Sequence, residues 1–167
     1  MLKMYLIGII TLLTTFSNAQ THYKTLLHDF QKISGRWEGS LTYLDYSSGK
    51  SYTMPANIDI KRINKTNQFE CFNSYPNETN ANATDTLVIS LDGKYIDKEW
   101  VKSRKKLPNG DVEIITEALS KDGNDDKPAT FRHTYTIGNT SYKKRKEVQF
   151  VGEDEWITRH EYSYTKK

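Results

Sequence analysis

Residues 33–46 read ISGRWEGSLTYLDY, and this stretch decides the fold because a helical pattern ends in it and an alternating pattern begins. Upstream, apolar residues at i, i+3, i+4, i+7 and i+10 predict a short helix over residues 23–33; they are Tyr23, Leu26, Leu27, Phe30 and Ile33. Gly35 supplies the permissive backbone with which helices often end. Downstream, one face of a first strand is expected to carry Trp37, Gly39, Leu41 and Tyr43.

The rest of the chain alternates with a period of two residues. The alternating segments are residues 54–60, 69–72, 87–91, 95–101, 112–118, 131–137, 142–150 and 156–164. Turn dipeptides such as Asp92-Gly93 and Asn109-Gly110 stand between several of them, and the polar residues 76–85 are expected to form an exposed loop. Short strands at this spacing, joined by such turns, predict an antiparallel sandwich or barrel.

The tryptophan at the start of the first strand has a physical purpose in a barrel. Closing an up-and-down sheet removes its two edges, but it leaves an open end that water can enter. A short helix followed by a large aromatic residue can fill that end, with Gly35 providing a sharp turn, Trp37 the floor and Gly39 room beside the indole. We therefore predict a closed antiparallel up-and-down β-barrel of about 8–10 strands, capped at one end by a short N-terminal helix.

The first residues, MLKMYLIGIITLLTTFSNAQ, have the pattern of a secretory signal. Lys3 precedes an apolar run that is too short for a membrane span, and Ser17 and Ala19 occupy the −3 and −1 positions of a cleavage site. Residues 1–19 are therefore predicted to be a signal peptide and 20–167 a single barrel domain. Cleavage near Ala19-Gln20 predicts an exported protein, periplasmic or extracellular, with no transmembrane segment after processing.

The net charge and the cysteine content of the chain argue against several kinds of function. The formal net charge is +3, and losing Lys3 with the signal leaves +2, which argues against a dedicated nucleic-acid surface. Cys71 is the single cysteine, so no internal disulfide can form. Its setting between Glu70 and Phe72 is typical of a small buried residue rather than a reactive thiol.

A Gly-x-Trp after a short helix, followed by an antiparallel meander, resembles the lipocalin and calycin superfamily. The first strand also resembles that of small secreted lipocalin-like proteins of Bacteroidota, through a shared W-x-G-x-L-T-Y-x-D-Y pattern. In lipocalins an arginine from the last strand covers the tryptophan. The resemblance therefore implies that Arg159, in the segment WITRHEY, contacts Trp37.

The resemblance also implies a small apolar or amphipathic ligand inside the barrel. The candidate ligand-binding residues are Tyr43, His133, Tyr135, His160 and Tyr162. The last strand has Trp156, Thr158, His160, Tyr162 and Tyr164 on one face, and the sequence leaves open whether this face points inward. Fatty-acid binders hold a carboxylate with an Arg-x-Tyr pair, but here Glu161 stands two residues after Arg159. The basic run 143–146 is either a solvated edge or a basic rim for an anionic ligand or envelope polymer.

Other functions are open. The chain could be a structural or interaction protein of the cell envelope, with a barrel filled by side chains. Nitrobindin-like haem proteins open with a similar G-x-W-x-G, and a haem-binding or enzymatic barrel would use His133 or His160. We find no catalytic motif and predict no cofactor. KDGNDDK at residues 121–127 lacks the glycine and the terminal glutamate of a calcium loop, so it predicts a polar hairpin and no metal site.

Overall fold

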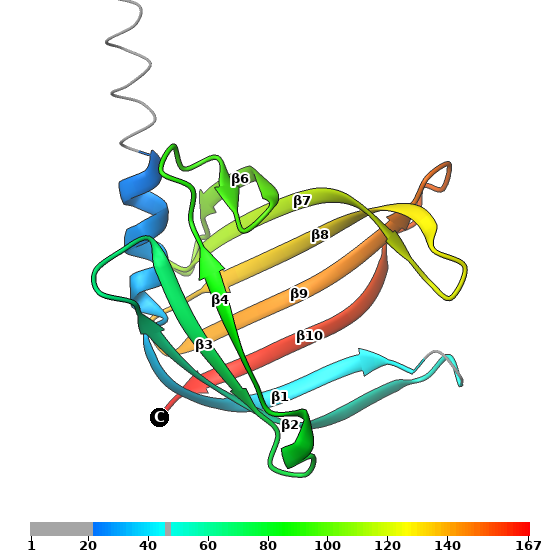
Figure 1. The fold of residues 1–167 in the computed structure, drawn as a ribbon, viewed down its shortest axis with the longest axis horizontal. Coiled ribbons are helices and arrows are strands. Elements are labelled where there is room, and N and C mark those ends of the chain that lie inside the picture. Colours follow the sequence, from blue (N-terminus) through cyan, green and yellow to red (C-terminus); the bar gives the residue numbers. More distant parts are fainter. Residues whose placement is uncertain (1–21, 46–47) are drawn as a thin grey trace, which may run out of the picture.

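The computed structural model describes residues 22–45 and 48–167, which form a ten-stranded antiparallel sheet curled into a nearly closed barrel, with one helix at one end (Figure 1). The helix covers residues 22–32, and the strands are β1 (Gly35–Leu44), β2 (Ser51–Arg62), β3 (Gln68–Ser74), β4 (Ala83–Val88), β5 (Tyr95–Ile96), β6 (Glu99–Lys106), β7 (Val112–Asp122), β8 (Lys127–Ile137), β9 (Ser141–Phe150) and β10 (Ile157–Lys166). A short 3-10 turn, η1 (Thr79–Ala81), precedes β4. The predicted fold class is confirmed. The predicted signal peptide lies outside the described residues, and none of the helices within them is long and apolar enough to cross a membrane.

The sheet runs in the order β4-β3-β2-β1-β10-β9-β8-β7-β6-β5. Its two ends meet where Ile89, just after β4, bridges to Ile96 of β5. The Asp97 N–H also donates to the Val88 carbonyl oxygen at 2.7 Å. Every other neighbouring pair in the sheet makes a longer ladder than this bridge, so we call this short junction the seam of the barrel.

Two glycines shape the start of β1. Gly35 has a φ of +115°, in the left-handed region that favours glycine, which confirms the predicted sharp turn after the helix. A Cβ at Gly39 would lie 2.0 Å from the Ser163 carbonyl oxygen and 2.8 Å from the Tyr164 Cα. Gly39 therefore makes room for the backbone of β10, and our expectation that it makes room for Trp37 is wrong.

Trp37 closes the end of the barrel beside the helix, as predicted. Its side chain is 1% exposed, and its indole Nε1 donates to the carbonyl oxygen of Ile33 at 2.7 Å. Its ring meets Tyr142 edge-on, with centroids 6.2 Å apart. A residue just after the helix thus ties the indole to the helix end, while a residue from β9 packs on its face.

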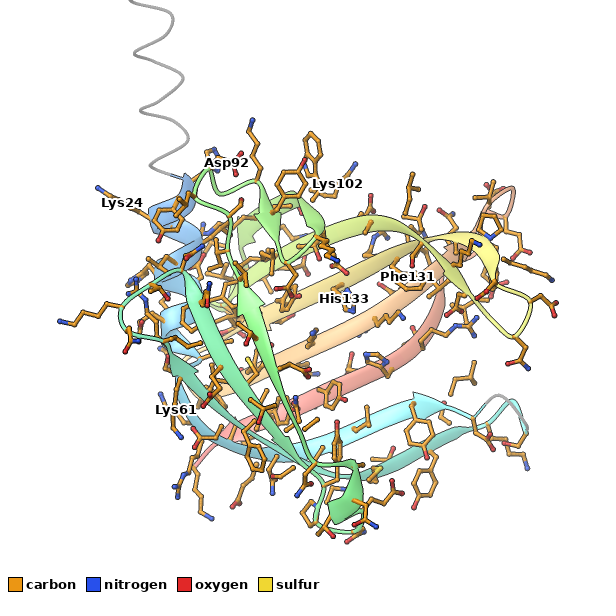
Figure 2. The ribbon with its side chains drawn as sticks, in the orientation of Figure 1. Lys24, Lys61, Asp92, Lys102, Phe131 and His133 are labelled. Carbon is orange, nitrogen blue, oxygen red and sulfur yellow. The ribbon has the colours of Figure 1, made fainter. Side chains whose placement is uncertain are left out.

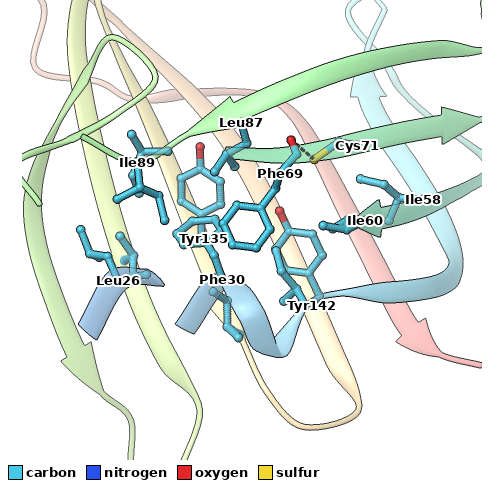
Figure 3. Close-up of a cluster of buried hydrophobic side chains, with 14 of the residues drawn as sticks. Leu26, Phe30, Ile58, Ile60, Phe69, Cys71, Leu87, Ile89, Tyr135 and Tyr142 are labelled. Atoms are coloured by element: carbon cyan, nitrogen blue, oxygen red, sulfur yellow. Dashed lines mark hydrogen bonds between the residues drawn. The ribbon is translucent and has the colours of Figure 1, made fainter. Parts of the chain in front are cut away.

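The core between the helix and the sheet is dominated by aromatic side chains (Figure 3). Phe30 is fully buried, with its ring centroid 5.4 Å from that of Tyr135 and 6.3 Å from that of Phe69. Burial of such large side chains is the main source of stability in a barrel without disulfides. Cys71 lies in the same cluster, which confirms the prediction of a buried cysteine.

The predicted contact between Trp37 and Arg159 is wrong. Trp37 pairs in register with Lys166, whose Nζ lies 5.5 Å from the centroid of the indole ring. Arg159 lies at the opposite end of β10, about 20 Å away by strand rise, and is ion-paired there with Asp122. The register of β1 against β10 decides which cation reaches the tryptophan, and the sequence does not reveal that register.

A buried ion pair holds the helix against the sheet. Asp29 is fully buried and accepts from Nε and Nη2 of Arg104 on β6, at 2.6 and 3.0 Å. The hydrogen bond to Asp29 raises the pKa of the Arg104 guanidinium. Because Asp29 stands among the apolar positions of the helix, this pairing is what makes its burial tolerable.

Candidate functional site

The open half of the barrel holds a cavity of about 300 Å³. It lies between β3 and β4 on one side and β8, β9 and β10 on the other, which face each other in Figure 1. Its apolar lining consists of Ile58, Leu87, Tyr142 and Tyr164. The volume is at the lower end of the range for small-molecule sites, about 300–1,000 Å³.

The inner face of β10 contributes His160, Tyr162 and Tyr164 to the cavity. The side chains of these three residues therefore point inward, a direction that the sequence had left open. The expectation that Trp156 and Thr158 share their face is wrong. A register shift between Thr158 and His160 interrupts the alternation, Thr158 is exposed, and the Trp156 ring packs under the Arg132 guanidinium at 3.7 Å. The bulge therefore ends the ligand-facing part of β10 at His160.

His133 reaches the cavity from β8, next to Phe131 along the strand (Figure 2). Its Nδ1 lies 2.7 Å from Oε1 of Glu99 on β6, and the hydroxyl of Thr116 also donates to this carboxylate. Burial alone would raise the pKa of Glu99, but the hydrogen bonds from His133 and Thr116 outweigh it and the pKa is lowered. Glu99 is therefore ionised at neutral pH and holds the ring of His133 in one orientation.

His160 faces the same space, with its ring centroid 6.5 Å from that of His133 and 5.5 Å from that of Tyr162. Burial, followed by the nearby charges of His133, Lys144 and Lys146, lowers the pKa of His160 to about 4. Its imidazole is therefore neutral at neutral pH. A neutral ring can accept or donate one hydrogen bond to a ligand.

Tyr162 spans the width of the cavity. Its hydroxyl lies 2.9 Å from that of Tyr75, which follows β3, and burial together with this hydrogen bond raises its pKa. Three of the five predicted ligand-binding residues therefore meet at the cavity, His133, His160 and Tyr162. Tyr135 is buried behind His133, in the core, and Tyr43 packs on Tyr52 with ring centroids 5.6 Å apart, away from the cavity lining.

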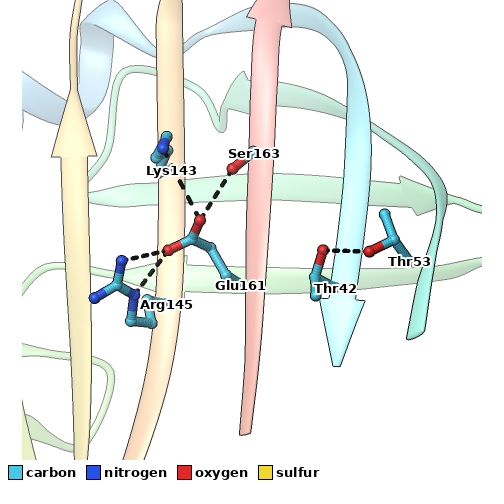
Figure 4. A network of polar contacts seen from close by, with 6 residues as sticks. All are labelled: Thr42, Thr53, Lys143, Arg145, Glu161 and Ser163. Carbon is cyan, nitrogen blue, oxygen red and sulfur yellow. Dashed lines mark hydrogen bonds and ion pairs between the residues drawn. The ribbon is translucent and has the colours of Figure 1, made fainter. Parts of the chain in front are cut away.

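The basic run on β9 is divided between the two faces of the sheet. Lys143 and Arg145 point outward, where Glu161 accepts from Arg145 at 2.7 Å and lies 3.9 Å from Lys143 (Figure 4). Lys144 and Lys146 line the cavity. The run is therefore neither wholly a solvated edge nor wholly a basic rim, and the sequence did not indicate which lysines point inward.

The wall opposite β9 carries two carboxyl groups that sequence reasoning missed, Asp85 and Asp97. Asp85 accepts from the Asn73 amide at 3.2 Å, and Asp97 accepts from the Val88 N–H at 2.8 Å. Burial raises the pKa of Asp97. Alternation along β4 places Asp85 on the same face as Leu87, and this was the available signal; Asp97 lies in a turn, where no periodicity helps.

Cys71 lines the cavity without being poised for reaction. Its Sγ lies 3.8 Å from the Phe69 carbonyl oxygen, and burial raises the pKa of the thiol to about 11. It is therefore a neutral thiol at physiological pH. Within residues 22–45 and 48–167, no group of three or more His, Cys, Asp or Glu side chains could hold a metal ion. The stretch 121–127 forms the hairpin between β7 and β8.

Comparison with known proteins adds a similarity of fold. No family profile matches the sequence, and no curated protein matches it. A solved structure, that of Rv2717c from M. tuberculosis, is similar to this chain with a TM-score of 0.50 and 13% sequence identity, covering 84% of this chain and 96% of the other. At this identity the similarity concerns the barrel fold alone.

Proposed function

We propose that this protein is an exported, lipocalin-like barrel that binds one small amphipathic molecule. The observation that carries the proposal is the cavity of about 300 Å³, in which an apolar floor faces polar side chains on the surrounding strands. Ligand sites commonly combine a mostly apolar lining with a few polar groups that fix orientation. A barrel filled with side chains, as the envelope-protein alternative requires, would leave no such space.

Two sequence features support the finer parts of this proposal. The N-terminal residues 1–19 have the charge, apolar run and cleavage site of a secretory signal. The helix, the Gly-x-Trp motif and the meander together support a relationship to lipocalins. The closing arginine of that family is replaced by Lys166 here, so the relationship rests on the first strand and the topology.

Native mass spectrometry of the protein purified from its own source tests for a retained ligand. Titration with the neutral fluorescent probe N-phenyl-1-naphthylamine gives an independent measure, because its emission rises on entering an apolar site. We expect binding by the unmodified protein and loss of binding in Asn73→Trp, which places a large ring in the cavity. The matched control is Leu119→Trp, since Leu119 is 86% exposed. Absence of both retained ligand and probe binding would overturn the proposal.

Haem binding is a second candidate, and one observation favours it. The His160 imidazole lines the cavity in its neutral form, which is the form that ligates iron. A titration with haemin, followed by absorption, tests this. A Soret shift that disappears in His160→Ala would support haem binding, and an unchanged haemin spectrum would remove it.

A further inference from the structure

We infer that the ligand carries a single negatively charged group, which Lys144 and Lys146 bind from the β9 wall of the cavity. This inference rests on the proposed binding function and adds the chemical class of the ligand and its orientation. The preference for an anionic ligand depends on which basic side chains inside the barrel are already paired with carboxylates.

Two of the basic side chains inside the barrel are already matched by carboxylates. Arg159 is 2.5 Å from Asp122, and His133 is 2.7 Å from Glu99. Each of these pairs satisfies both of its members within the protein. Neither pair leaves a positive group that an incoming ligand would need to neutralise.

Lys144 and Lys146 differ from these pairs. Among the described residues, no carboxylate oxygen lies within 4.0 Å of the Nζ of either lysine. Their Nζ atoms lie over aromatic rings instead, that of Lys146 at 3.8 Å from Phe131 and that of Lys144 at 5.6 Å from Tyr135. Burial lowers the pKa of Lys146 although Asp122 and Glu99 attract it from a distance, as expected for a partly dehydrated ammonium with no carboxylate in direct contact. An anion between the two lysines would supply that direct contact.

The opposite wall limits the charge of the ligand. Asp85 on β4 and Asp97 in the turn between β5 and β6 also line the cavity. Their carboxyl groups would repel a second negative charge on the ligand, so a polyanion is disfavoured. The cavity thus has a basic side on β9 and an acidic side formed by β4 and the turn after β5, and a molecule with one anionic group fits only with that group toward β9.

The apolar remainder of the ligand would then lie on the floor made by Ile58, Leu87, Tyr142 and Tyr164. These side chains lie on four strands, β2, β4, β9 and β10, and form the inner end of the cavity toward the helix. The chemical class is a small amphipathic monoanion, such as a medium-chain carboxylate or an aromatic sulfonate. The recognition does not use Arg159, in contrast to the last-strand arginine of fatty-acid binders.

Two probes that differ by one sulfonate group test this inference. 1-Anilinonaphthalene-8-sulfonate has the skeleton of N-phenyl-1-naphthylamine with an added sulfonate. We expect the unmodified protein to bind the sulfonate about tenfold more tightly than the neutral probe. Lys144→Met and Lys146→Met should each remove most of that preference and leave the neutral probe bound. Methionine keeps the length and apolar character of the lysine stem, and circular dichroism and thermal melting would establish that the variants are folded.

The control is Lys143→Met, on the same strand but on the outer face, where its side chain is 53% exposed. It should leave the affinities of both probes unchanged. Equal binding of the two probes, or a preference that survives both cavity substitutions, would overturn the anionic inference while leaving the binding function intact. Failure of both probes to bind would overturn the binding function itself, so the two failures are distinguishable.

Discussion

The two ends of the barrel interior solve different problems. At the helix end, Trp37, Phe30 and Phe69 fill the space with aromatic rings, and all three are nearly fully buried. At the open end, charged and polar side chains such as His133 and Lys146 surround a cavity. Strands β8, β9 and β10 contribute side chains to both regions. The difference shows that the interior of a small barrel can be divided along its axis. Side chains at one end pack the core, and side chains at the other end can bind a ligand.

A row of aromatic rings connects the two regions. Tyr142 stacks on Tyr164 with ring centroids 5.7 Å apart, and Tyr164 stacks on Tyr162 at 5.8 Å. Tyr142 also touches Trp37 in the packed end, while Tyr162 reaches His160 in the open end. The row thus begins at a mostly apolar indole in the packed end and finishes at a polar imidazole in the open end. Substitutions in the packed end should therefore mainly lower stability, and substitutions in the open end should mainly weaken ligand binding.

The largest effect on stability is expected in the packed end. Trp37→Ala removes a buried indole and its hydrogen bond to Ile33, and should lower the free energy of unfolding by about 3–5 kcal/mol. Urea denaturation measures this value. The control is Trp100→Ala, because Trp100 is 54% exposed, and it should cost less than about 1 kcal/mol.

The same substitution tests the corrected position of Arg159. Arg159 lies at the opposite end of β10 from Lys166, the partner of Trp37 on β1. Trp37→Ala and Arg159→Ala should therefore have additive effects on the free energy of unfolding, within about 0.5 kcal/mol. A double-mutant cycle measures the coupling. A coupling well above that limit would mean that the two residues are in contact and that our register is wrong.

A somewhat smaller loss is expected at the attachment of the helix. Asp29→Ala breaks the ion pair with Arg104 and should cost about 3 kcal/mol, less than the upper range for buried pairs because Arg104 can turn toward water. Chemical denaturation measures the loss. Asp59→Ala is the matched control, because Asp59 contacts the well-exposed Lys61 and Arg36, and it should cost below about 1 kcal/mol. Equal losses in the two variants would contradict a structural role for the buried pair.

The open end should make stability dependent on pH. The pKa of His160 is about 4 in the folded protein, against an ordinary value of 6.5. Between these values the unfolded chain binds the extra proton, so the contribution of His160 is fully present above pH 6.5 and is lost as the pH falls toward 4. This loss should amount to about 2 kcal/mol. Unfolding curves of the unmodified protein and His160→Gln at pH 7 and pH 4.5 measure it, and parallel pH profiles would contradict it.

The smallest effect is expected on the outer face of β9 and β10. Glu161→Gln weakens the contacts with Lys143 and Arg145, whose side chains are about half exposed. Such pairs contribute about 0–1 kcal/mol. The variant should therefore melt within a few degrees of the unmodified protein and bind each naphthyl probe with the same affinity as the unmodified protein does. A large loss of stability would show that the outer network has a larger role than its exposure suggests.

Local signals in the sequence predicted the packed end well. The apolar period from Tyr23 to Ile33 predicted a helix that the structure has at residues 22–32, and the position of Trp37 after Gly35 predicted its burial. These features depend on contacts between residues close in the sequence, or on the size of one side chain. The turn at Asp92-Gly93 was predicted for the same reason, and Gly93 has a φ of +70°.

Features that depend on register were missed. The cation over Trp37 is set by the pairing of β1 with β10, and the inward turn of Arg159 toward Asp122 is set by a bulge. Residues 95–101 were predicted as one strand, but a turn at Asp97, with a φ of +55°, divides them into β5 and β6. No glycine marks that turn. The predicted polar loop 76–85 is partly wrong as well, because β4 begins at residue 83.

The pairing of β1 with β10 has a consequence for how the chain acquires its structure. Trp37 stands opposite Lys166, so one of the central ladders of the sheet joins the first strand to the last. Contacts so distant in sequence are slow to form, because a long loop must close before they bring any gain. The β1–β4 and β5–β9 segments can pair locally as the chain lengthens, but the long ladder that joins them through β10 forms only after the last strand is made. The ladder between the first and last strands is therefore among the last parts of the sheet that the chain can complete.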